Sequence, residues 1–326
     1  METVSVGLVI VRIVIAAVVL ITFGFVNAIV MGYLERKIAA KIQRRPGPME
    51  VGWQGILQLI VDGFKIISKQ LIIPRDVDRR LFRMAPLLSF TPVVLPFIVI
   101  PFSEKLQARD INLGLLFIIS VSSINVMTIL LAGWSSNNKY AMFGAMRSVA
   151  QNIAFEIPVL LSLLTIVLMT NTYSMQGIVH AQSKIWFVLV QPLAFLIYFV
   201  AGIAETNRAP FDLPEAESEL TAGFHTEYSG FGFSLFMMSE YANMFLVCSI
   251  ATVLFLGGWK GIPLPMGEYT GAIWFLMKVY TLMLVMVWIR WTYPRVRFDQ
   301  LLNFSWKYLI PFSLVNLLIT VVIVKL

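Results

Sequence analysis

The stretch that decides the fold is VGLVIVRIVIAAVVLITFGFVNAIVMGYL, residues 6–34, in which Arg12 is the single charged side chain. A helix needs about 20 apolar residues to cross the hydrocarbon layer of a bilayer, so this run is long enough to span it. It is also too long for the apolar core of a secretory signal peptide, and no small-residue cleavage site follows it. The sequence therefore predicts a permanent transmembrane helix here.

Similar apolar runs recur along the chain, whose 326 residues are 58% hydrophobic and 13% charged, with a mean hydropathy of +0.81. This composition is typical of a membrane protein and not of two soluble domains. The sequence predicts an all-α membrane protein of about eight transmembrane helices in a single membrane domain, residues 1–326. The expected spans are 6–34, 84–103, 112–132, 152–171, 186–204, 233–257, 271–292 and 306–325.

Lys and Arg are distributed unevenly between alternate connections. The first, third, fifth and seventh connections are basic, and because cytoplasmic loops are enriched in Lys and Arg, we expect them to face the cytoplasm, with both termini on the outer, periplasmic side. The two long connections, 35–82 and 205–232, belong to this basic side. We interpret the net charge of +7 as a topology signal and not as a nucleic-acid surface. The opposite side carries Lys105, Arg109, Lys184, Lys260 and Lys325.

The first long connection contains an amphipathic segment over about residues 53–72. A one-faced polar stripe indicates a helix at the membrane interface and not a ninth crossing, and the surrounding Arg and Lys can be simple interfacial anchors. Glu35 and Arg36 are different, because at the end of an apolar helix they can meet the head group of an elongated ligand at a lipid-facing cleft. The stripe recurs every three or four residues, at Gln54, Gln58, Asp62, Lys65 and Lys69.

The second long connection gathers carboxylates in ETNRAPFDLPEAESEL, residues 205–220. Asp212, Pro214 and Glu215 have the form of a helix capping box, which would explain two of these acids. The other acids are not explained in this way, and the predicted topology brings them to the same side of the membrane. They are Glu156, Glu205, Glu217, Glu219, Glu227 and Glu240.

Two interpretations of the acids stay open, and they can coexist. Carboxylates about 5 Å apart at an effective dielectric near 20 repel by roughly 3 kcal/mol, or about two pKa units, so some would hold protons near neutral pH and form a coupled proton relay. Alternatively, the acids form ion pairs with Arg147, Arg208, Lys278 and Arg290.

The sequence carries no GxGxxG, P-loop, haem or iron–sulfur pattern, so we expect no cofactor in this chain and no electron transfer by it alone. The single cysteine, Cys248, lies in an apolar span and is expected to serve packing. The two histidines, His180 and His225, fall in connections predicted on opposite faces, so no His-based metal site is expected.

Several motifs, in order, identify a resemblance. They are ERKIAAKIQRRPGP from residue 35, GWSSNNKYAMFGAMRSVAQNIAFEIP from 133, ETNRAPFDLPEAESELTAGFHTEYSG from 205, SEYANMF from 239 and IRWTYPRVRFDQ from 289. Together they cover nearly the whole chain and closely resemble the quinone-chamber membrane subunit of respiratory complex I, the H subunit of the bacterial enzyme. The resemblance implies a heel subunit of a proton-pumping NADH:quinone oxidoreductase, in a bacterial inner membrane in preference to the mitochondrial one.

The resemblance also implies roles for residues and partners. A tunnel built by the first span, the amphipathic helix and the fifth and sixth spans would admit quinone, the substrate, from the bilayer. FMN and iron–sulfur clusters are expected in partner subunits, and the expected partners are the peripheral quinone-site and iron–sulfur subunits, small and antiporter-like membrane subunits, and lipid. The implied quinone residues are Glu35, Arg36, Asp62, Lys65, Arg208, Asp212, Glu215 and Phe224. The implied proton-relay residues are Glu156, Glu205, Glu217, Glu219, Glu227, Glu240, Lys139, Arg147, Lys278, Arg290 and Arg295.

The chain departs from the family pattern at Leu59, where many relatives have Pro, at Gln70, where Glu is common, and at Phe155, where Tyr is common. The last change puts the hydrogen bonding of Glu156 in doubt. Alternative functions are a homologous membrane subunit of an energy-converting hydrogenase or of a ferredoxin- or F420-linked relative, and a passive membrane scaffold. A secondary ion transporter would predict inverted repeats, which the sequence does not display.

Overall fold

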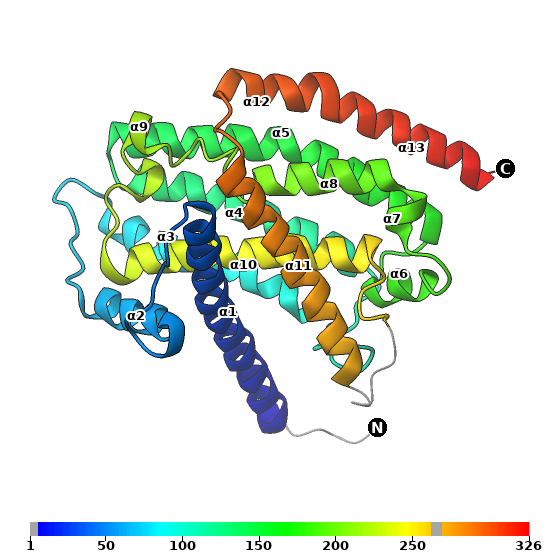
Figure 1. Cartoon of the computed structure of the whole chain (residues 1–326), viewed down its shortest axis with the longest axis horizontal. Helices are drawn as coiled ribbons and strands as arrows, with labels where there is room; N and C mark the ends of the chain where they lie inside the picture. Colours follow the sequence, from blue (N-terminus) through cyan, green and yellow to red (C-terminus); the bar gives the residue numbers. More distant parts are fainter. Residues whose placement is uncertain (1–5, 262–268, 326) are drawn as a thin grey trace.

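The computed structural model describes the backbone of residues 6–261 and 269–325, and side chains within these ranges from residue 15 onward except those of residues 217 and 218. Every regular element in this described part is a helix, which confirms the predicted all-α class (Figure 1). The helices are α1 (Val6–Ile42), η1 (Trp53–Gly55), α2 (Gln58–Ser68), α3 (Arg79–Val94), η2 (Leu95–Ile98), α4 (Gly114–Ser135), α5 (Lys139–Thr170), α6 (Met175–Ala181), α7 (Phe187–Val190), α8 (Pro192–Glu205), α9 (Glu217–Leu220), η3 (Gly223–His225), α10 (Gly230–Phe255), α11 (Thr270–Thr292), α12 (Phe298–Phe304), η5 (Ser305–Leu309) and α13 (Ile310–Lys325).

Seven helical segments of the described chain are long and apolar enough to cross a membrane: α1, α3 with η2, α4, α5, α10, α11, and the continuous run of α12, η5 and α13. The other expected span, 186–204, is divided at Gln191 into α7 and α8, and α8 alone has 14 residues. Pro192 begins α8, where its missing N–H costs no helical hydrogen bond. The proline ring disfavours continuation of the preceding turn, which explains the break. The count of eight crossings stays a prediction.

Helix α10 forms the centre of the bundle, because 83% of its most apolar stretch is buried inside the protein. It packs against α1, α2, α3, α6, α8 and α11 (Figure 1). The approach of α8 is close: a Cβ atom added to Gly202 would lie 2.6 Å from Cγ1 of Val247. Helices in lipid associate largely through such packing of small residues, so this contact fixes the α8–α10 spacing.

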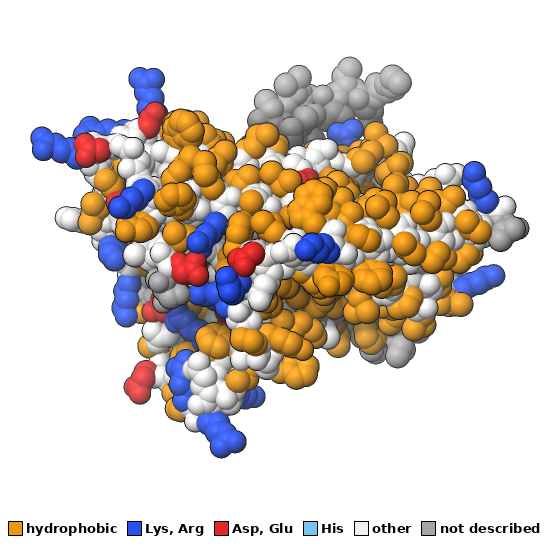
Figure 2. All heavy atoms as spheres, turned by 90° about the horizontal axis from the view of Figure 1, so that it is seen from above, with side chains coloured by type: hydrophobic (Ala, Val, Ile, Leu, Met, Phe, Trp, Pro, Cys, Tyr) orange, Lys and Arg blue, Asp and Glu red, His pale blue; other side chains and the backbone are white. Residues whose placement is uncertain are grey.

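The two long connections, which contain α2 and α9, lie at one end of the molecule (Figure 1). The Ile72 amide donates to Ser229 Oγ at 3.0 Å, which joins the two connections, and Asn138 Nδ2 donates to Glu227 Oε1 at 2.6 Å, which joins the second connection to the start of α5. Charged side chains gather at this end in Figure 2, whereas hydrophobic side chains cover the long remainder of that face. The two connections thus meet at one end of the molecule (Figure 1), and their place on the cytoplasmic side of the membrane stays a prediction.

An amphipathic helix is present in the first connection, but it is shorter than the expected 53–72. Gln54 has a φ of 53°, outside the helical range, so η1 does not continue into α2. Within α2, Gln58 Nε2 donates to Asp62 Oδ1 at 3.0 Å, one turn along the predicted polar face. None of the residues of α2 is fully buried, although the helix packs against α1 and α10.

Candidate functional site

An apolar cleft of about 370 Å³ opens between α1, α2 and α10. Its walls are mostly hydrophobic, with side chains such as Phe25, Phe231 and Met238. Arg36 and Asp62 add polar atoms, and Arg36 Nη1 donates to Asp62 Oδ2 at 2.6 Å. Burial alone would raise the pKa of Asp62, but hydrogen bonds from Arg36 and Gln58 lower it below the ordinary value. The cleft has the size and composition of a site for an apolar ligand with a polar end.

A polar cavity of about 330 Å³ adjoins this cleft. Arg36, Met237 and Tyr241 line both spaces, so the two meet along these residues. Acidic and basic side chains from four parts of the chain converge on the polar cavity, which makes it the meeting point of the charged residues singled out in the sequence. Its polar lining includes Glu35, Asn207, Arg208, Asp212, Glu215, Glu240 and Arg290.

The buried guanidinium of Arg208 organises the polar cavity. Arg208 is 5% exposed, and its Nη1 and Nη2 lie 3.4 Å from Glu35 Oε2 and 3.4 Å from Glu240 Oε2. The Tyr241 ring centroid is 4.5 Å from Arg208 Cζ, and its hydroxyl donates to Glu35 at 3.0 Å. Arg290 donates to the other oxygen of Glu35. Burial alone would lower the pKa of Arg208, but Glu35 and Glu240 raise it, so the group stays charged.

The capping box expected at Asp212 and Glu215 is wrong. Residues 212–216 are not helical, with a turn at Pro214 and Glu215, and α9 begins after them without a side-chain cap. Asp212 Oδ2 accepts instead from Arg295 Nη2 at 3.3 Å. Burial raises the pKa of Asp212 despite Arg295, and burial raises the pKa of Glu215. Both acids therefore hold a proton at higher pH than exposed carboxyls do.

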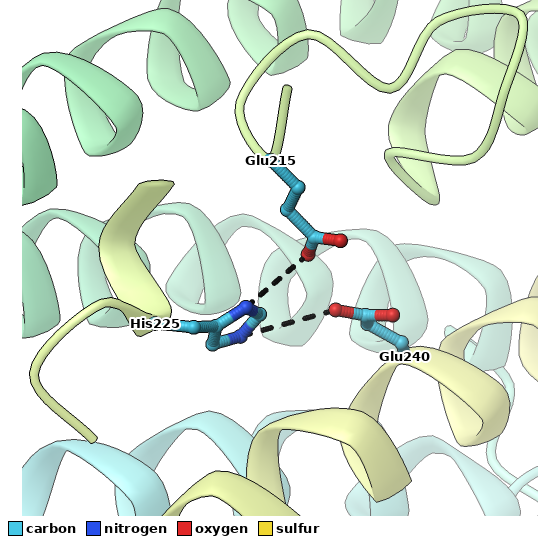
Figure 3. A group of neighbouring side chains, drawn as sticks. All are labelled: Glu215, His225 and Glu240. Carbon is cyan, nitrogen blue, oxygen red and sulfur yellow. Dashed lines mark ion pairs between the residues drawn. The ribbon is translucent and has the colours of Figure 1, made fainter. Parts of the chain in front are cut away.

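Glu215 and Glu240 both face the ring of His225 (Figure 3). Glu215 Oε1 lies 3.5 Å from Nδ1, and Glu240 Oε1 lies 3.9 Å from Nε2. Burial lowers the pKa of His225 to about 4, although Glu240 acts in the opposite sense, so the imidazole is neutral near pH 7. One ligand atom of each of the three residues lies within 4.8 Å of the others, so the grouping is a candidate for a metal ion. The expectation of no metal site compared only the two histidines and did not consider one histidine with two carboxylates.

Two facing glycines position the loop that carries Glu215 and His225. Gly223 has a φ of 56°, and a Cβ atom there would lie 1.9 Å from the carbonyl oxygen of Pro214. A Cβ atom at Gly144 of α5 would lie 2.7 Å from the Gly223 Cα. Only glycine fits at this contact, because a side chain would collide with backbone atoms. The loop backbone therefore rests directly on α5.

Two smaller polar cavities extend from His225 into the bundle. The first has about 20 Å³ of space for the centre of a water molecule, and its lining includes His225, Glu240, Asn125 and Asn243. The second has about 10 Å³, and its lining includes Asn125, Asn243 and Glu205. Since one water centre needs about 10–15 Å³, each space is of the order of one water molecule. The shared asparagines join the two spaces into a polar line.

This polar line ends near Glu156, on α5. Glu205 lies close enough to Glu156 for the two charges to interact. Ser123 Oγ of α4 donates to Glu156 Oε1 at 2.6 Å. Phe155, at the position where tyrosine is common in the family, is fully buried and packs on Phe211 with ring centroids 5.9 Å apart. Ser123 therefore supplies a hydrogen bond to Glu156.

Two of the predicted quinone residues lie outside both the apolar cleft and the polar cavity. Lys65 is exposed on α2. Phe224 is buried, and its ring centroid lies 3.9 Å from that of His225, so it belongs to the packing around the histidine.

Some predicted relay residues form a peripheral set near the same end of the molecule. Arg147 Nη1 donates to Glu219 Oε2 at 2.5 Å, and Glu227 accepts from Asn138. Lys139 begins α5, with its Nζ 5.1 Å from the ring centroid of Tyr140. Ion pairing with these acids is thus confirmed for Arg147 and Arg208, whereas Arg290 pairs with Glu35 of α1. The side chain of Glu217 lies outside the described residues.

Lys278 lies elsewhere, and its expected ion pair with the acidic cluster is wrong. Its Nζ donates to the carbonyl oxygens of Leu256 at 2.7 Å, Gly258 at 3.0 Å and Lys260 at 2.6 Å. These carbonyls follow the C-terminal end of α10, where helix carbonyls lack helical donors. Along α11, Lys278 precedes Arg290 by about 18 Å at 1.5 Å per residue. The ammonium therefore closes the α10–α11 connection at the opposite end.

Sequence reasoning missed the roles of His225, Tyr241, Asn125 and Asn243 in these cavities. The sequence did point to Tyr241 and Asn243, because both follow Glu240 closely in SEYANMF. Tyr241 is the next residue, and Asn243, three residues after Glu240, lies on the same helical face as Glu240. Asn125 had no local signal, since it lies on α4 and its place depends on tertiary packing.

Comparison with known proteins gives a consistent result. The sequence model of the NADH dehydrogenase family matches residues 14–321. The chain is 48% identical to the H subunit of the NADH-quinone oxidoreductase of Desulfotalea psychrophila, covering 98% of both chains. It is 45% identical to the proteins of the same name in Carboxydothermus hydrogenoformans, over 94% of this chain and 87% of the relative, and in Geobacillus thermodenitrificans, over 95% and 93%.

Proposed function

Because the chain belongs to the family of NADH-quinone oxidoreductase H subunits, we propose that its apolar cleft and polar cavity form the chamber in which complex I binds quinone. The protein is a membrane subunit of this enzyme complex and is not catalytic alone. The observation that carries the proposal is the junction of the two spaces at Arg36, Met237 and Tyr241. An isoprenoid tail suits the apolar cleft, and a polar head group suits the charged cavity.

The head group reaches the polar cavity with its tail still between α1, α2 and α10. Glu35, Arg208 and Tyr241 present charged and hydroxyl groups to that space. The electrons come from outside this chain, from FMN and iron–sulfur clusters in partner subunits, and a peripheral subunit supplies the remaining contacts of the head group. What this chain contributes is access from lipid, orientation of the head group and protonatable groups beside it.

The carboxylates couple quinone reduction to proton movement. A quinone that accepts electrons must also take up protons, which creates a demand beside Glu215 and Glu240. Burial favours the protonated form of Glu215, as a proton donor requires. The polar line through Asn125 and Asn243 connects the acids beside the quinone with Glu205 and Glu156 in the membrane, so protons can be supplied along it. From there, protonation changes pass to antiporter-like subunits.

The placement in the membrane follows from the charge distribution. The end with both long connections faces the cytoplasm of a bacterial cell, α7 and α8 together complete an eighth crossing, and both termini lie on the periplasmic side. The basic connections then meet the peripheral arm, and the lipid-facing sides of α1 and α2 open the cleft toward the inner membrane.

Neutralising a central acid tests the proposal. In the assembled complex, Glu240→Gln should lower NADH:quinone turnover about tenfold or more, because the position can no longer exchange a proton. NADH oxidation by an artificial acceptor should persist, since the electron-carrying subunits are intact. Glu104→Gln, exposed at the opposite end of the molecule, is the matched control and should change neither rate. Full quinone turnover in both Glu240→Gln and Glu156→Gln would overturn the coupling role.

A further inference from the structure

The imidazole of His225 packs against aromatic rings, lines the first of the two small cavities and faces two carboxylates. Only 4% of the residue is exposed, and the ring centroids of Phe236 and Phe233 lie 5.1 and 5.6 Å away. Among the described residues, His225 Nε2 has no protein hydrogen-bond partner. A buried polar atom of this kind costs free energy unless a nearby group can satisfy it. The nearest groups are the carboxyls of Glu215 and Glu240.

Each carboxyl is aimed at a different nitrogen of the ring (Figure 3). Glu215 Oε1 faces Nδ1 at 3.5 Å and Glu240 Oε1 faces Nε2 at 3.9 Å, so a small movement brings each into hydrogen-bond range. Both acids line the polar cavity, Glu215 from the loop and Glu240 from α10, and Glu240 also lines the first of the small cavities that lead into the bundle. The histidine thus lies between an acid of the loop and an acid of α10.

The chemistry of the ring limits the protonation of this set. A neutral imidazole has one N–H donor and one bare nitrogen that accepts. Two ionised carboxylates would both need donors, so one of them would face the bare nitrogen unfavourably. When one carboxyl carries a proton, that acid donates to the bare nitrogen and the ring N–H donates to the other acid. The arrangement therefore fits a set of three groups that shares one additional proton.

We propose that His225 carries protons between Glu240 of α10 and Glu215 of the loop, as a step in the proton path at the inner end of the quinone chamber. This inference rests on the proposed function, because it gives the proton path a defined step. Glu240 as carboxylic acid gives its proton to Nε2, the O–H bond breaks, and the Nδ1–H proton moves to the Glu215 carboxylate. One proton enters and one leaves, so the ring stays neutral and ends as the Nε2–H tautomer. The ring must return from the Nε2–H to the Nδ1–H tautomer before the next transfer, so protons pass one at a time.

The same geometry fits a bound metal ion poorly. A metal would take one ring nitrogen and both carboxylates on that nitrogen's side, whereas here the acids face different nitrogens. The other oxygen of Glu240 lies 3.4 Å from the Arg208 guanidinium, whose charge opposes a cation. The charged groups around the ring are therefore Glu215 from the loop, Glu240 from α10 and Arg208 beyond it.

The test replaces the ring while keeping its size and polarity. In the assembled complex, His225→Gln keeps one donor and one acceptor but cannot take up and release a proton. We expect NADH:quinone turnover to fall about tenfold, with an increased solvent deuterium isotope effect and unchanged oxidation of NADH by an artificial acceptor. His180→Gln, at the exposed end of α6, is the matched control and should keep the wild-type rate and isotope effect. A purely structural role of His225 would lower assembly or thermal stability without raising the isotope effect.

Outcomes that overturn the inference differ from those that overturn the proposed function. If His225→Gln keeps full quinone turnover while Glu240→Gln loses it, the carboxyls exchange protons directly and the histidine link is wrong, although the chamber proposal stands. If both variants keep full turnover, the coupling role fails as well. A zinc or manganese ion present in stoichiometric amount in the wild-type complex, and lost in His225→Gln, would replace the proton link with a metal site.

Discussion

Arg208 is a buried cation of the bundle and Lys278 is a partly buried one, and their surroundings differ. Carboxylates surround Arg208, with Glu35 and Glu240 each 3.4 Å away. Backbone carbonyls surround Lys278, from Leu256, Gly258 and Lys260. Both arrangements satisfy a charge that lipid would otherwise penalise.

The difference lies in what each arrangement can change. A carboxylate can take up a proton, so the charge balance around Arg208 can alter during turnover. A carbonyl cannot, so the contacts of Lys278 are fixed and hold the end of α10 to the connection that leads to α11. The carboxylates around Arg208 suit a role in turnover, and the carbonyls around Lys278 suit a role in stability. Mutations at Arg208 and Lys278 should therefore differ in their effects on turnover and on stability.

The largest effect is expected at the carboxylate-bound cation. Arg208→Gln leaves two buried acids with one positive neighbour fewer, and removing one partner of a buried ion pair costs about 3–5 kcal/mol. An equal loss in the transition state would slow NADH:quinone turnover by about two hundredfold to several thousandfold. Both are measured in purified complex, by thermal unfolding and by quinone-linked turnover. Arg109→Gln, exposed at the opposite end, is the control.

Lys278→Met should lower stability without an equal loss of turnover. The change leaves three carbonyls without their donor, and an unsatisfied buried group costs about 1–3 kcal/mol. Turnover of the complex that does assemble should stay within about twofold of wild type. The measurements are the midpoint of thermal unfolding and the rate per assembled complex, with exposed Lys184→Met as control. A rate loss as large as that of Arg208→Gln would remove the distinction between the two cations.

A smaller effect is expected in the pH dependence of stability, which tests whether the His225 ring is neutral in the folded protein. Because burial lowers the pKa of His225 from 6.5 to about 4, the unfolded chain binds a proton below pH 6.5 that the folded chain does not. Wild-type stability is therefore lost as pH falls below 6.5. His225→Gln should gain about 1 kcal/mol relative to wild type between about pH 7.5 and 5.5. Thermal unfolding at both pH values measures this, with His180→Gln as control. An equal change in both variants would mean that His225 is charged in the fold.

The smallest effect is expected at the cleft, where Arg36 and Asp62 form a partly exposed pair. Such pairs contribute about 1 kcal/mol or less and weaken with salt. In a double-mutant cycle with Arg36→Gln and Asp62→Asn, we expect a coupling energy in this range and a rise of about two- to threefold in the apparent KM for quinone. Repeating the cycle in high salt should reduce the coupling. A coupling as large as the loss in Arg208→Gln would make the cleft as critical as the buried cavity.

Hydropathy predicted much of the fold, because a helix that crosses lipid must be apolar over its whole length. Residues 6–34, for example, lie within α1. The break at Pro192 escaped prediction, because apolar residues stand on both sides of it and only the backbone geometry separates α7 from α8. The helix expected at Asp212 failed for a related reason. Its local pattern matched a cap, but Arg295, 83 residues away, bonds the carboxylate instead.

The sequence predicted which charged residues gather at the site better than it predicted which of them contact one another. Alternating topology brought Glu205, Glu215 and Glu240 to one end, and the structure confirms that Glu215 and Glu240 meet. Which acid meets which cation depends on helix rotation and tilt, which composition does not encode. Lys278 illustrates this, because its apolar surroundings suggested a partner among the acids, whereas its contacts are carbonyls at the far end of α10.

The contact between Gly144 and Gly223 has a practical consequence for genetics. These residues have no side chains, yet their contact holds Pro214, and with it Glu215, against α5. A methyl group at Gly223 would push the Pro214 carbonyl outward and alter the distance between Glu215 and His225 without changing any charge. A screen for uncoupled variants that covers only polar positions would miss this class, so saturation of both glycines belongs in its design.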